Sequence, residues 1–200
     1  MSDIRKYFNI INTNTNNTNN TTNNNTNNTN NNLDKGSITI FTDGSSKNNG
    51  QKNKPSSGGI GIYIEDTKEC ISEKLTGKIT NNIAELKACI KGIKHIINRS
   101  GYSNSNIIVY SDSEYVINSI TKWAPTWYKN GWTKYDKFKK KKIDIKNKEL
   151  IIELYNLYNT YSIQFIHTKA HGVKPYDENT KEYKLWYGNY MADKLAVDAN

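Results

Sequence analysis

The fold is decided by residues 83–112, which read IAELKACIKGIKHIINRSGYSNSNIIVYSD. The first half carries the stripe of an amphipathic helix, in which apolar residues recur every three or four positions: Ile83, Leu86, Ile90, Ile93 and Ile97. Residues 100–106 are a polar break, and residues 107–110, IIVY, are typical of a short buried strand. This succession predicts helices packed against a sheet.

The segments on either side extend this α/β pattern. The chain order predicts strands at 37–42, 58–64 and 70–75, helices at 113–122 and 148–158, a strand at 163–167 and a closing helix at 190–199. Three strands are followed by helix–strand–helix and then by strand–helix. We therefore predict a mixed five-stranded sheet covered by helices.

The N-terminal part has a different composition. Residues 12–32 consist of 14 Asn and 7 Thr and offer nothing to bury, so we expect a disordered linker over 12–35 between a short peptide, 1–11, and a domain over 36–200. No apolar run is long enough to span a membrane, and the first ten residues lack the apolar core of a signal peptide. Two cysteines are too few for a disulfide scaffold. We expect a monomeric intracellular protein, not secreted and without a membrane partner.

Positive charge is concentrated in one block. The chain has a net charge of +9, and residues 134–148 contain eight Lys against two Asp. Such a block on an intracellular protein indicates a polyanionic partner, of which nucleic acid is the first candidate. The alternative is an ordinary solvated surface in a lysine-rich chain.

Four carboxylates occupy positions that could converge. Asp43 and Asp112 are expected just after strands, whereas Glu85 and Asp193 are expected in the first turns of helices. Carboxylate oxygens gathered at one sheet edge suit Mg²⁺. Taken singly, each has a simpler explanation: a hairpin turn for Asp43, a helix cap for Asp112, and the helix dipole for Glu85 and Asp193.

Five ordered segments carry a family resemblance. They are TDGSS (42–46), TNNIAEL (80–86), YSDSEYVI (110–117), HTKAHG (167–172) and GNYMADKLA (188–196). Together they resemble the signature segments of type 1 ribonucleases H, and ITKWAPTWYKNGW (120–132) resembles the start of that family's basic handle. The resemblance implies a ribonuclease H-like α/β fold with strand order 3-2-1-4-5 and helices on both faces. It also implies hydrolysis of the RNA strand of RNA–DNA hybrids, leaving 5′-phosphate and 3′-hydroxyl ends, in replication or repair.

The resemblance also assigns the catalytic residues. Asp43, Glu85, Asp112 and Asp193 match the family's metal-binding carboxylates, with Asp43 between two Mg²⁺ ions, for which Mn²⁺ is a possible substitute. His171 matches a mobile-loop histidine that helps proton transfer or product release. The chain departs from the family in the long segment between His171 and Asp193. That segment could be a neutral insertion, an enlarged lid or an extra substrate contact.

Substrate contacts follow from the same resemblance. The expected contacts to the RNA strand come from Asn81 and Asn82, and from the main chain of Gly44, Ser45 and Ser46, which would reach 2′-hydroxyls. The DNA strand would contact Trp123 and Trp127. One of its phosphates would be bound by Lys78, Thr80 and Asn147. Lys139, Lys140, Lys141 and Lys142 would hold phosphates from the handle. The alternatives are core packing for the tryptophans and a plain solvated face for the handle.

The N-terminal peptide has a resemblance of its own. Ile4, Tyr7 and Phe8 resemble the short motif by which replication proteins bind a sliding clamp of the PCNA type, although its usual leading Gln is absent. The alternative is a frayed terminus with chance aromatics. For the whole protein, two rival functions remain: a catalytically weak hybrid-binding module of the same fold, and another nuclease of the wider superfamily, such as a resolvase or transposase core.

Overall fold

The computed structural model describes residues 36–47, 56–102, 105–169 and 172–200. The N-terminal half of the domain comprises β1 (Ser37–Lys47), β2 (Ser57–Ile64), β3 (Glu69–Leu75), α1 (Asn81–Ile97), β4 (Asn106–Ser111) and α2 (Glu114–Asn118). There follow a π-helical turn, η2 (Ser119–Trp123), then α3 (Ala124–Lys129), β5 (Thr133–Asp136), β6 (Lys141–Asp144), α4 (Lys148–Thr160), β7 (Ile163–His167) and α5 (Lys181–Asp198). The expected peptide 1–11 and linker 12–35 lie outside the described residues.

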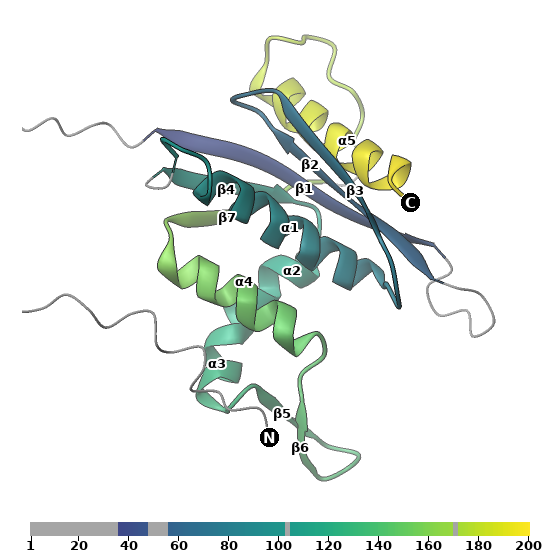
Figure 1. Ribbon diagram of the computed structural model, residues 1–200, viewed down its shortest axis with the longest axis vertical. Helices are drawn as coiled ribbons and strands as arrows, with labels where there is room; N and C mark the ends of the chain where they lie inside the picture. The colour runs from purple at the N-terminus through teal and green to yellow at the C-terminus, as the bar shows by residue number, and fades with distance from the viewer. Residues whose placement is uncertain (1–35, 48–55, 103–104, 170–171) are drawn as a thin grey trace, which may run out of the picture. The chain divides into compact units, whose positions relative to one another are not determined.

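One five-stranded sheet organises the domain (Figure 1). Its strand order is β3-β2-β1-β4-β7, with β1 antiparallel to β2 and parallel to β4. The predicted mixed sheet and its 3-2-1-4-5 order are therefore confirmed, with β7 as the fifth strand. Strands β5 and β6 form a separate antiparallel hairpin within the predicted handle.

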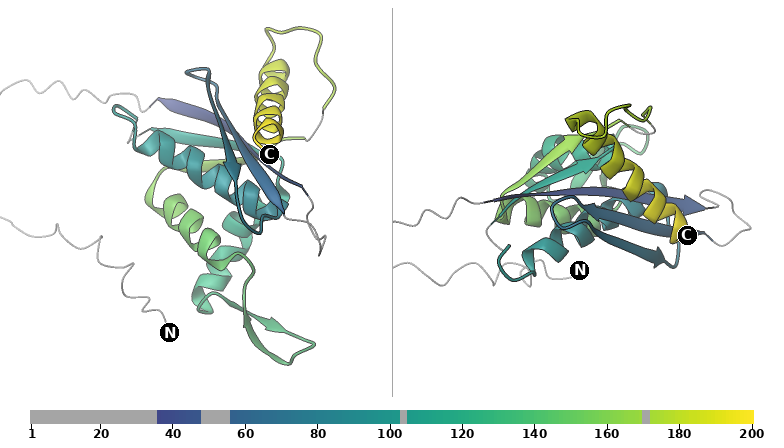
Figure 2. Two further views of the ribbon diagram at one scale, coloured as in Figure 1. Left: turned by 45° about the vertical axis from the view of Figure 1, so that its right-hand side comes forward. Right: turned by 90° about the horizontal axis from the view of Figure 1, so that it is seen from above.

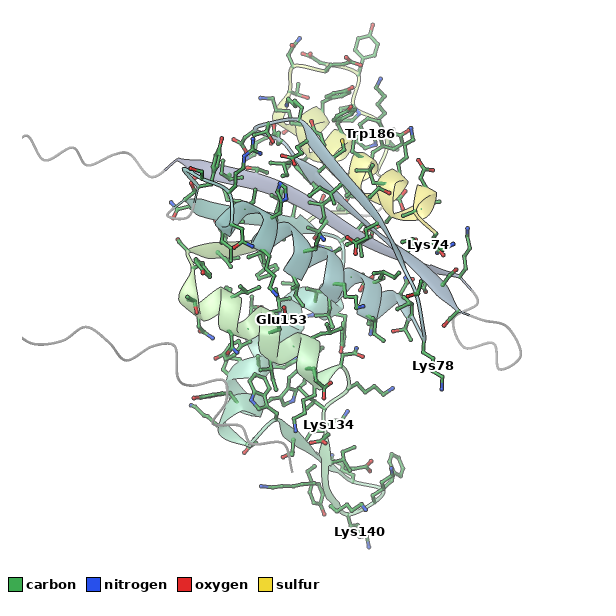
Figure 3. The ribbon with its side chains drawn as sticks, viewed as in Figure 1. Lys74, Lys78, Lys134, Lys140, Glu153 and Trp186 are labelled. Carbon is green, nitrogen blue, oxygen red and sulfur yellow. The ribbon has the colours of Figure 1, made fainter. Side chains whose placement is uncertain are left out.

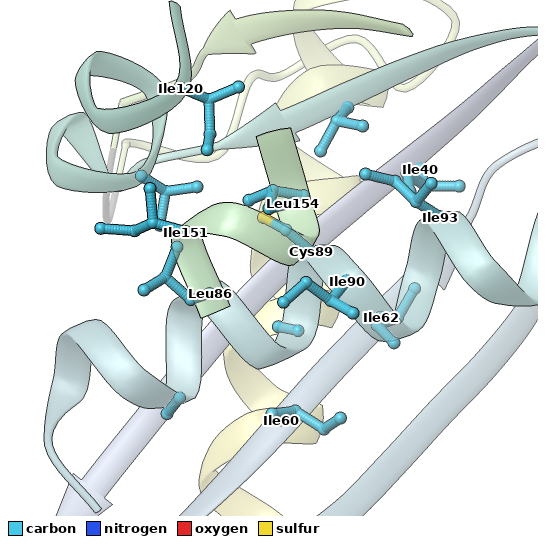
Figure 4. Close-up of a cluster of buried hydrophobic side chains, with 14 of the residues drawn as sticks. Ile40, Ile60, Ile62, Leu86, Cys89, Ile90, Ile93, Ile120, Ile151 and Leu154 are labelled. Carbon is cyan, nitrogen blue, oxygen red and sulfur yellow. The ribbon is translucent and has the colours of Figure 1, made fainter. Parts of the chain in front are cut away.

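Helices cover both faces of the sheet. Side chains alternate along a strand, so Ile40 of β1 and Ile62 of β2 face α1, where Gly92 lets them approach closely (Figure 4). Helix α4 completes this core with Ile151 and Leu154, which are fully buried. The opposite face receives α5, seen across β1 and β2 in Figure 2.

Close backbone contact fixes α5 on the sheet. A Cβ atom added to Gly61 would lie 2.0 Å from the carbonyl oxygen of Ala192, and one added to Gly59 would lie 2.2 Å from that of Ala196. Gly188 of α5 in turn leaves room for the ring of Phe41. These small residues set the depth at which α5 packs.

Two predicted helices have different bounds in the structure. The closing helix begins at Lys181 rather than at residue 190, capped by the Thr180 hydroxyl, which accepts a hydrogen bond from the Tyr183 amide. The helix expected at 113–122 is the pair α2 and η2, which continues into α3. Among the residues that the structure describes, no helix is both long and apolar enough to cross a membrane.

Candidate active site

Asp43 lies inside β1, opposite Gly61 of β2, and not beyond the strand as its Asp-Gly sequence led us to expect. The pairing of β1 with β4 ends at Phe41 and Tyr110, so Asp43 lies just past the end of β4. Asp112 directly follows β4, as predicted. Two neighbouring parallel strands thus bring these carboxylates to the same edge of the sheet.

The other two carboxylates come from helices on opposite faces. Glu85 lies in the second turn of α1, which begins at Asn81, and Asp193 lies beyond the middle of α5. The prediction that both occupy first turns is wrong, because each helix starts earlier than its apolar pattern suggests. Their place beside Asp43 comes from helix packing and not from the helix dipole.

The electrostatics of Asp43 show that the four carboxylates form one cluster. Burial, followed by the negative charges of Asp112, Asp193 and Glu85, raises the pKa of Asp43 to about 7, against a smaller lowering by the Gly44 backbone. Burial also raises the pKa of Glu85, and Asp112 adds to this effect, although a hydrogen bond from Ser113 opposes it. A divalent cation would relieve this repulsion, because hard cations bind carboxylate oxygens.

The described residues include no group of three or more His, Cys, Asp or Glu side chains already arranged to hold a metal ion. The fit of this site to a metal therefore rests on its donor chemistry: four carboxylates, one of them buried among the charges of the others. By their chemistry these residues fit a divalent cation, because hard cations bind carboxylate oxygens.

Two polar groups that were not predicted as site residues support the cluster. The Ser113 hydroxyl donates to Glu85 Oε2 at 2.5 Å and also caps α2, accepting from the Val116 amide at 3.3 Å. His167 Nε2 lies 3.2 Å from the carbonyl oxygen of Asp112. Ser113 directly follows Asp112, so a Ser at the N-cap beside a predicted catalytic Asp was the available signal.

The residues expected to contact RNA adjoin the cluster. Ser46 Oγ donates to Asn81 Oδ1 at 2.9 Å, which joins the TDGSS and TNN segments, and Asn82 is half-buried beside Asn81 at the start of α1. Gly44, Ser45 and Ser46 do not form the expected loop, because all three lie in β1 and pair with β2. The Ser45 hydroxyl is taken up inside the protein, where it donates to the carbonyl oxygen of Ala196.

Three residues expected at a DNA phosphate have different surroundings. Lys78 is exposed, whereas the Thr80 hydroxyl caps α1 by accepting from the Ile83 amide at 3.3 Å. Asn147 adopts a left-handed backbone with φ of 55° and donates from Nδ2 to the Tyr115 hydroxyl at 3.0 Å. Both Thr80 and Asn147 thus have structural roles at helix starts.

The two tryptophans form an aromatic pair. The rings of Trp123 and Trp127 lie 5.6 Å apart between centroids, and Tyr115 contacts Trp123 at 6.3 Å. Trp123 is 40% exposed, whereas Trp127 packs against the main core. The core-packing alternative therefore describes Trp127 better than Trp123.

The basic block projects from the domain as a hairpin, with Lys134 near its base and Lys140 at its outer end (Figure 3). Its turn is closed by Asp136, whose Oδ1 accepts from the amides of Phe138 and Lys139 at 2.9 and 3.0 Å. Lys139, Lys140, Lys141 and Lys142 are all exposed. Phe138 is also fully exposed, so this surface combines charge with an aromatic ring.

His171 and the peptide residues Ile4, Tyr7 and Phe8 lie outside the described residues. The other two histidines lie within regular elements of the fold. The Nε2 atom of His95, within α1, lies 2.9 Å from a carboxylate oxygen of Glu69, and His167 ends β7.

Most of the chain matches a known protein family. A profile described as RNase H matches residues 35–200. The chain belongs to the ribonuclease H family. A ribonuclease H from Clostridium botulinum is 34% identical over 163 residues, covering 81% of this chain and 94% of that protein. Ribonuclease H1 from Mus musculus is 33% identical and covers 80% of this chain, which spans about half the length of the mouse protein (49%).

Solved structures agree with this assignment. The solution structure of the PFV RNase H domain superposes with a TM-score of 0.59 at 25% identity, covering 81% of this chain and 93% of that domain. A type 1 RNase H with the type 2 active-site motif has a TM-score of 0.60 at 20% identity and shows the shared fold. This ribonuclease H is an endoribonuclease of RNA–DNA hybrids, and members of its family depend on divalent metal ions.

Proposed function

We propose that this ribonuclease H cleaves the RNA strand by two-metal catalysis with Mg²⁺. Asp43 would lie between the two ions, Asp193 would complete one site, and Glu85 and Asp112 would complete the other. Bound there, the ions would activate a water molecule and stabilise the departing 3′-oxygen. The observation that carries the proposal is the position of Asp43 and Asp112 at one edge of the sheet, with Glu85 and Asp193 close enough for their charges to act on Asp43. Burial and these charges raise the pKa of Asp43 to about 7.

The chain's own residues prepare this site. Ser113 holds one carboxylate oxygen of Glu85 by its hydrogen bond, which leaves the other oxygen for an ion. His171 would assist proton transfer or product release, as imidazole titrates near neutral pH. The reaction would leave 5′-phosphate and 3′-hydroxyl ends.

We propose that substrate binding divides between two regions. Asn81 and Asn82, with Ser46 hydrogen-bonded to Asn81, would contact 2′-hydroxyls of the RNA strand. The exposed ring of Trp123 would pack against deoxyribose of the DNA strand, supported by Trp127. The remaining contacts, all to DNA phosphates, would come from Lys78, Thr80, Asn147 and the handle lysines Lys139–Lys142.

The most direct test of this function compares end-labelled RNA–DNA, RNA–RNA and DNA–DNA duplexes, with and without Mg²⁺. The proposal expects cleavage of the RNA strand in the hybrid alone, and only with the metal. Hybrid binding without cleavage would support the binding-module alternative. Cleavage of a DNA–DNA duplex would support another nuclease of the superfamily.

We further propose that residues 1–11 recruit the enzyme to a sliding clamp at sites of replication, through Ile4, Tyr7 and Phe8. The support is the spacing of these residues in the sequence, followed by an Asn/Thr-rich stretch that suits a flexible tether. A peptide of residues 1–12 should bind the cognate clamp in calorimetry, and replacing both aromatics by alanine should abolish binding. No binding at high micromolar clamp would refute the idea.

A further inference from the structure

The first half of α5 carries a cluster of aromatic side chains in the segment where the chain departs from its family. Four rings form two parallel stacks. Trp186 and Tyr190 lie 5.3 Å apart with an interplanar angle of 8°, and Tyr183 and Tyr187 lie 5.9 Å apart with an angle of 12°. What these stacks can bind depends on what each ring faces.

The two stacks have different surroundings. Tyr187 makes an edge contact with Tyr63 at 5.7 Å and packs against the small core under α5, so it is part of the fold. Tyr183 joins the two stacks, since its ring centroid also lies 5.6 Å from that of Trp186. Tyr190, by contrast, is 45% exposed. The Trp186–Tyr190 stack therefore presents aromatic surface that the domain itself does not cover.

This stack shares a flank of the helix with Asp193. Trp186 precedes Asp193 by seven residues and Tyr190 precedes it by three, and both intervals bring side chains to nearly the same side of a helix. Along the helix axis, the backbone positions of Tyr190 and Trp186 lie about 5 and about 10 Å, respectively, from that of Asp193. The stack thus extends outward from the active site along α5.

The orientation of Trp186 is fixed from the neighbouring segment (Figure 3 labels the residue). Its indole Nε1 donates to the carbonyl oxygen of Gly172 at 2.8 Å, and the Lys174 ammonium lies 5.9 Å from its ring centroid. Lys174 is itself held by Glu178 at 3.0 Å. A ring pre-organised in this way loses little conformational entropy when a ligand stacks beside it.

We propose that the Trp186–Tyr190 pair is a stacking platform for an unpaired RNA nucleotide about one to three positions from the cleaved bond, given about 3.4 Å per stacked base. The enzyme would then favour hybrids whose RNA strand continues beyond the duplex as a single strand. This inference rests on the proposed catalytic role of Asp193, which places the RNA strand at this flank. In the interior of a duplex, neighbouring bases cover both faces of each base, so away from a duplex end an exposed ring can stack only on an unpaired base.

The charge of the segment shows how the platform would bind. Residues 172–190 carry three Lys and three acidic residues, so they have no net charge. Binding there would depend on stacking and not on phosphate contacts. Its contribution should therefore be nearly independent of salt, in contrast to that of the handle.

The test compares a blunt hybrid with the same hybrid carrying a single-stranded RNA tail of about six nucleotides, at either end. We expect wild-type kcat/KM to favour one tailed hybrid by about 5-fold or more, because the unpaired base would stack on the Trp186–Tyr190 pair. Tyr190→Leu should bring the ratio of kcat/KM for the tailed hybrid to kcat/KM for the blunt hybrid close to one, whereas Tyr190→Phe should keep the wild-type ratio. The matched control is Tyr176→Leu, which removes a fully exposed tyrosine of the same segment and should also keep the ratio.

A binding measurement separates the platform from catalysis. With 2-aminopurine in the tail, the Asp112→Asn protein should quench its fluorescence on binding, and the added Tyr190→Leu change should remove the quenching. A tail preference that Tyr190→Leu retains, or one that disappears between 50 and 200 mM salt, would overturn the platform. Failure of the wild-type enzyme to cut any hybrid would instead refute the proposed function.

Discussion

Asp43 illustrates how one residue acquires its properties from three elements. Strand alternation turns its side chain toward the face of the sheet that α5 covers, since its neighbour Gly44 meets α1 on the other face. The end of β4 brings Asp112 beside it, and the packed helices add Glu85 and Asp193. The protein therefore keeps a buried carboxylate among three others at a cost to its own stability.

That cost predicts an unusual stability effect. The pKa of Asp43 is about 7 in the folded protein and near 3.8 when unperturbed, so between these values the folded state binds more protons than the unfolded state. Stability from this group is present in full below about pH 4 and is lost as pH rises through 7. Without metal at pH 8, Asp43→Asn should stabilise the fold by up to about 4 kcal/mol, and the gain should vanish near pH 4.

The measurement is urea unfolding of both proteins at pH 4 and pH 8 in the presence of a chelator. Adding Mg²⁺ at pH 8 should reduce the difference in free energy of unfolding between Asp43→Asn and the wild type, because the ion would stabilise only the protein with the full set of carboxylates. An Asp43→Asn protein that is less stable than the wild type at pH 8 would contradict the proposed electrostatic cluster.

At the scale of the element, α5 shows where sequence patterns mislead. Its first ten residues, KEYKLWYGNY, lack an apolar stripe because the positions facing the sheet include Gly188 and Asn189, both buried. The hairpin of β5 and β6 was equally hidden, since its short strands are mostly charged and exposed. Strands β1, β2 and β4 and helix α1 were predictable because their apolar residues face a core on regular periods.

Gly61 tests whether the depth of α5 matters. A Cβ atom there would lie 2.0 Å from the backbone oxygen of Ala192 and 2.5 Å from the nitrogen of Ala196, so α5 would have to move away from β2. Gly61→Ala should destabilise the protein by about 1–3 kcal/mol and lower activity, because Asp193 moves with the helix. Urea unfolding and cleavage rates measure the two effects. The control is Gly36→Ala, where no atom lies within 4 Å of the added Cβ; equal stability of the two variants would refute the argument.

At the scale of the whole molecule, five short segments predicted the catalytic constellation although their separate structural contexts were partly wrong. Asp43 lies within a strand, and Glu85 and Asp193 lie beyond the first turns of their helices. The types and order of these residues carried the prediction. Their convergence could not be derived from periodicity, because it depends on how closely α1 and α5 pack on opposite faces of one sheet.

The handle should contribute long-range charge rather than specificity. Replacing Lys139, Lys140, Lys141 and Lys142 by glutamine should weaken binding to all hybrids alike, because these exposed side chains would contact phosphates. The slope of log affinity against log salt should become shallower by up to about 3–4 units. An unchanged slope would mean that the lysines form only a solvated face.

The central claim is that the four carboxylates form the catalytic centre for the RNA strand, and Asp112→Asn tests it most directly. The amide is nearly isosteric with the carboxylate but lacks the charge that a metal ion requires. With Mg²⁺, single-turnover cleavage of an end-labelled hybrid should fall by at least about 10³-fold while hybrid affinity stays within a few-fold of wild type. Near-normal cleavage by Asp112→Asn would contradict the account.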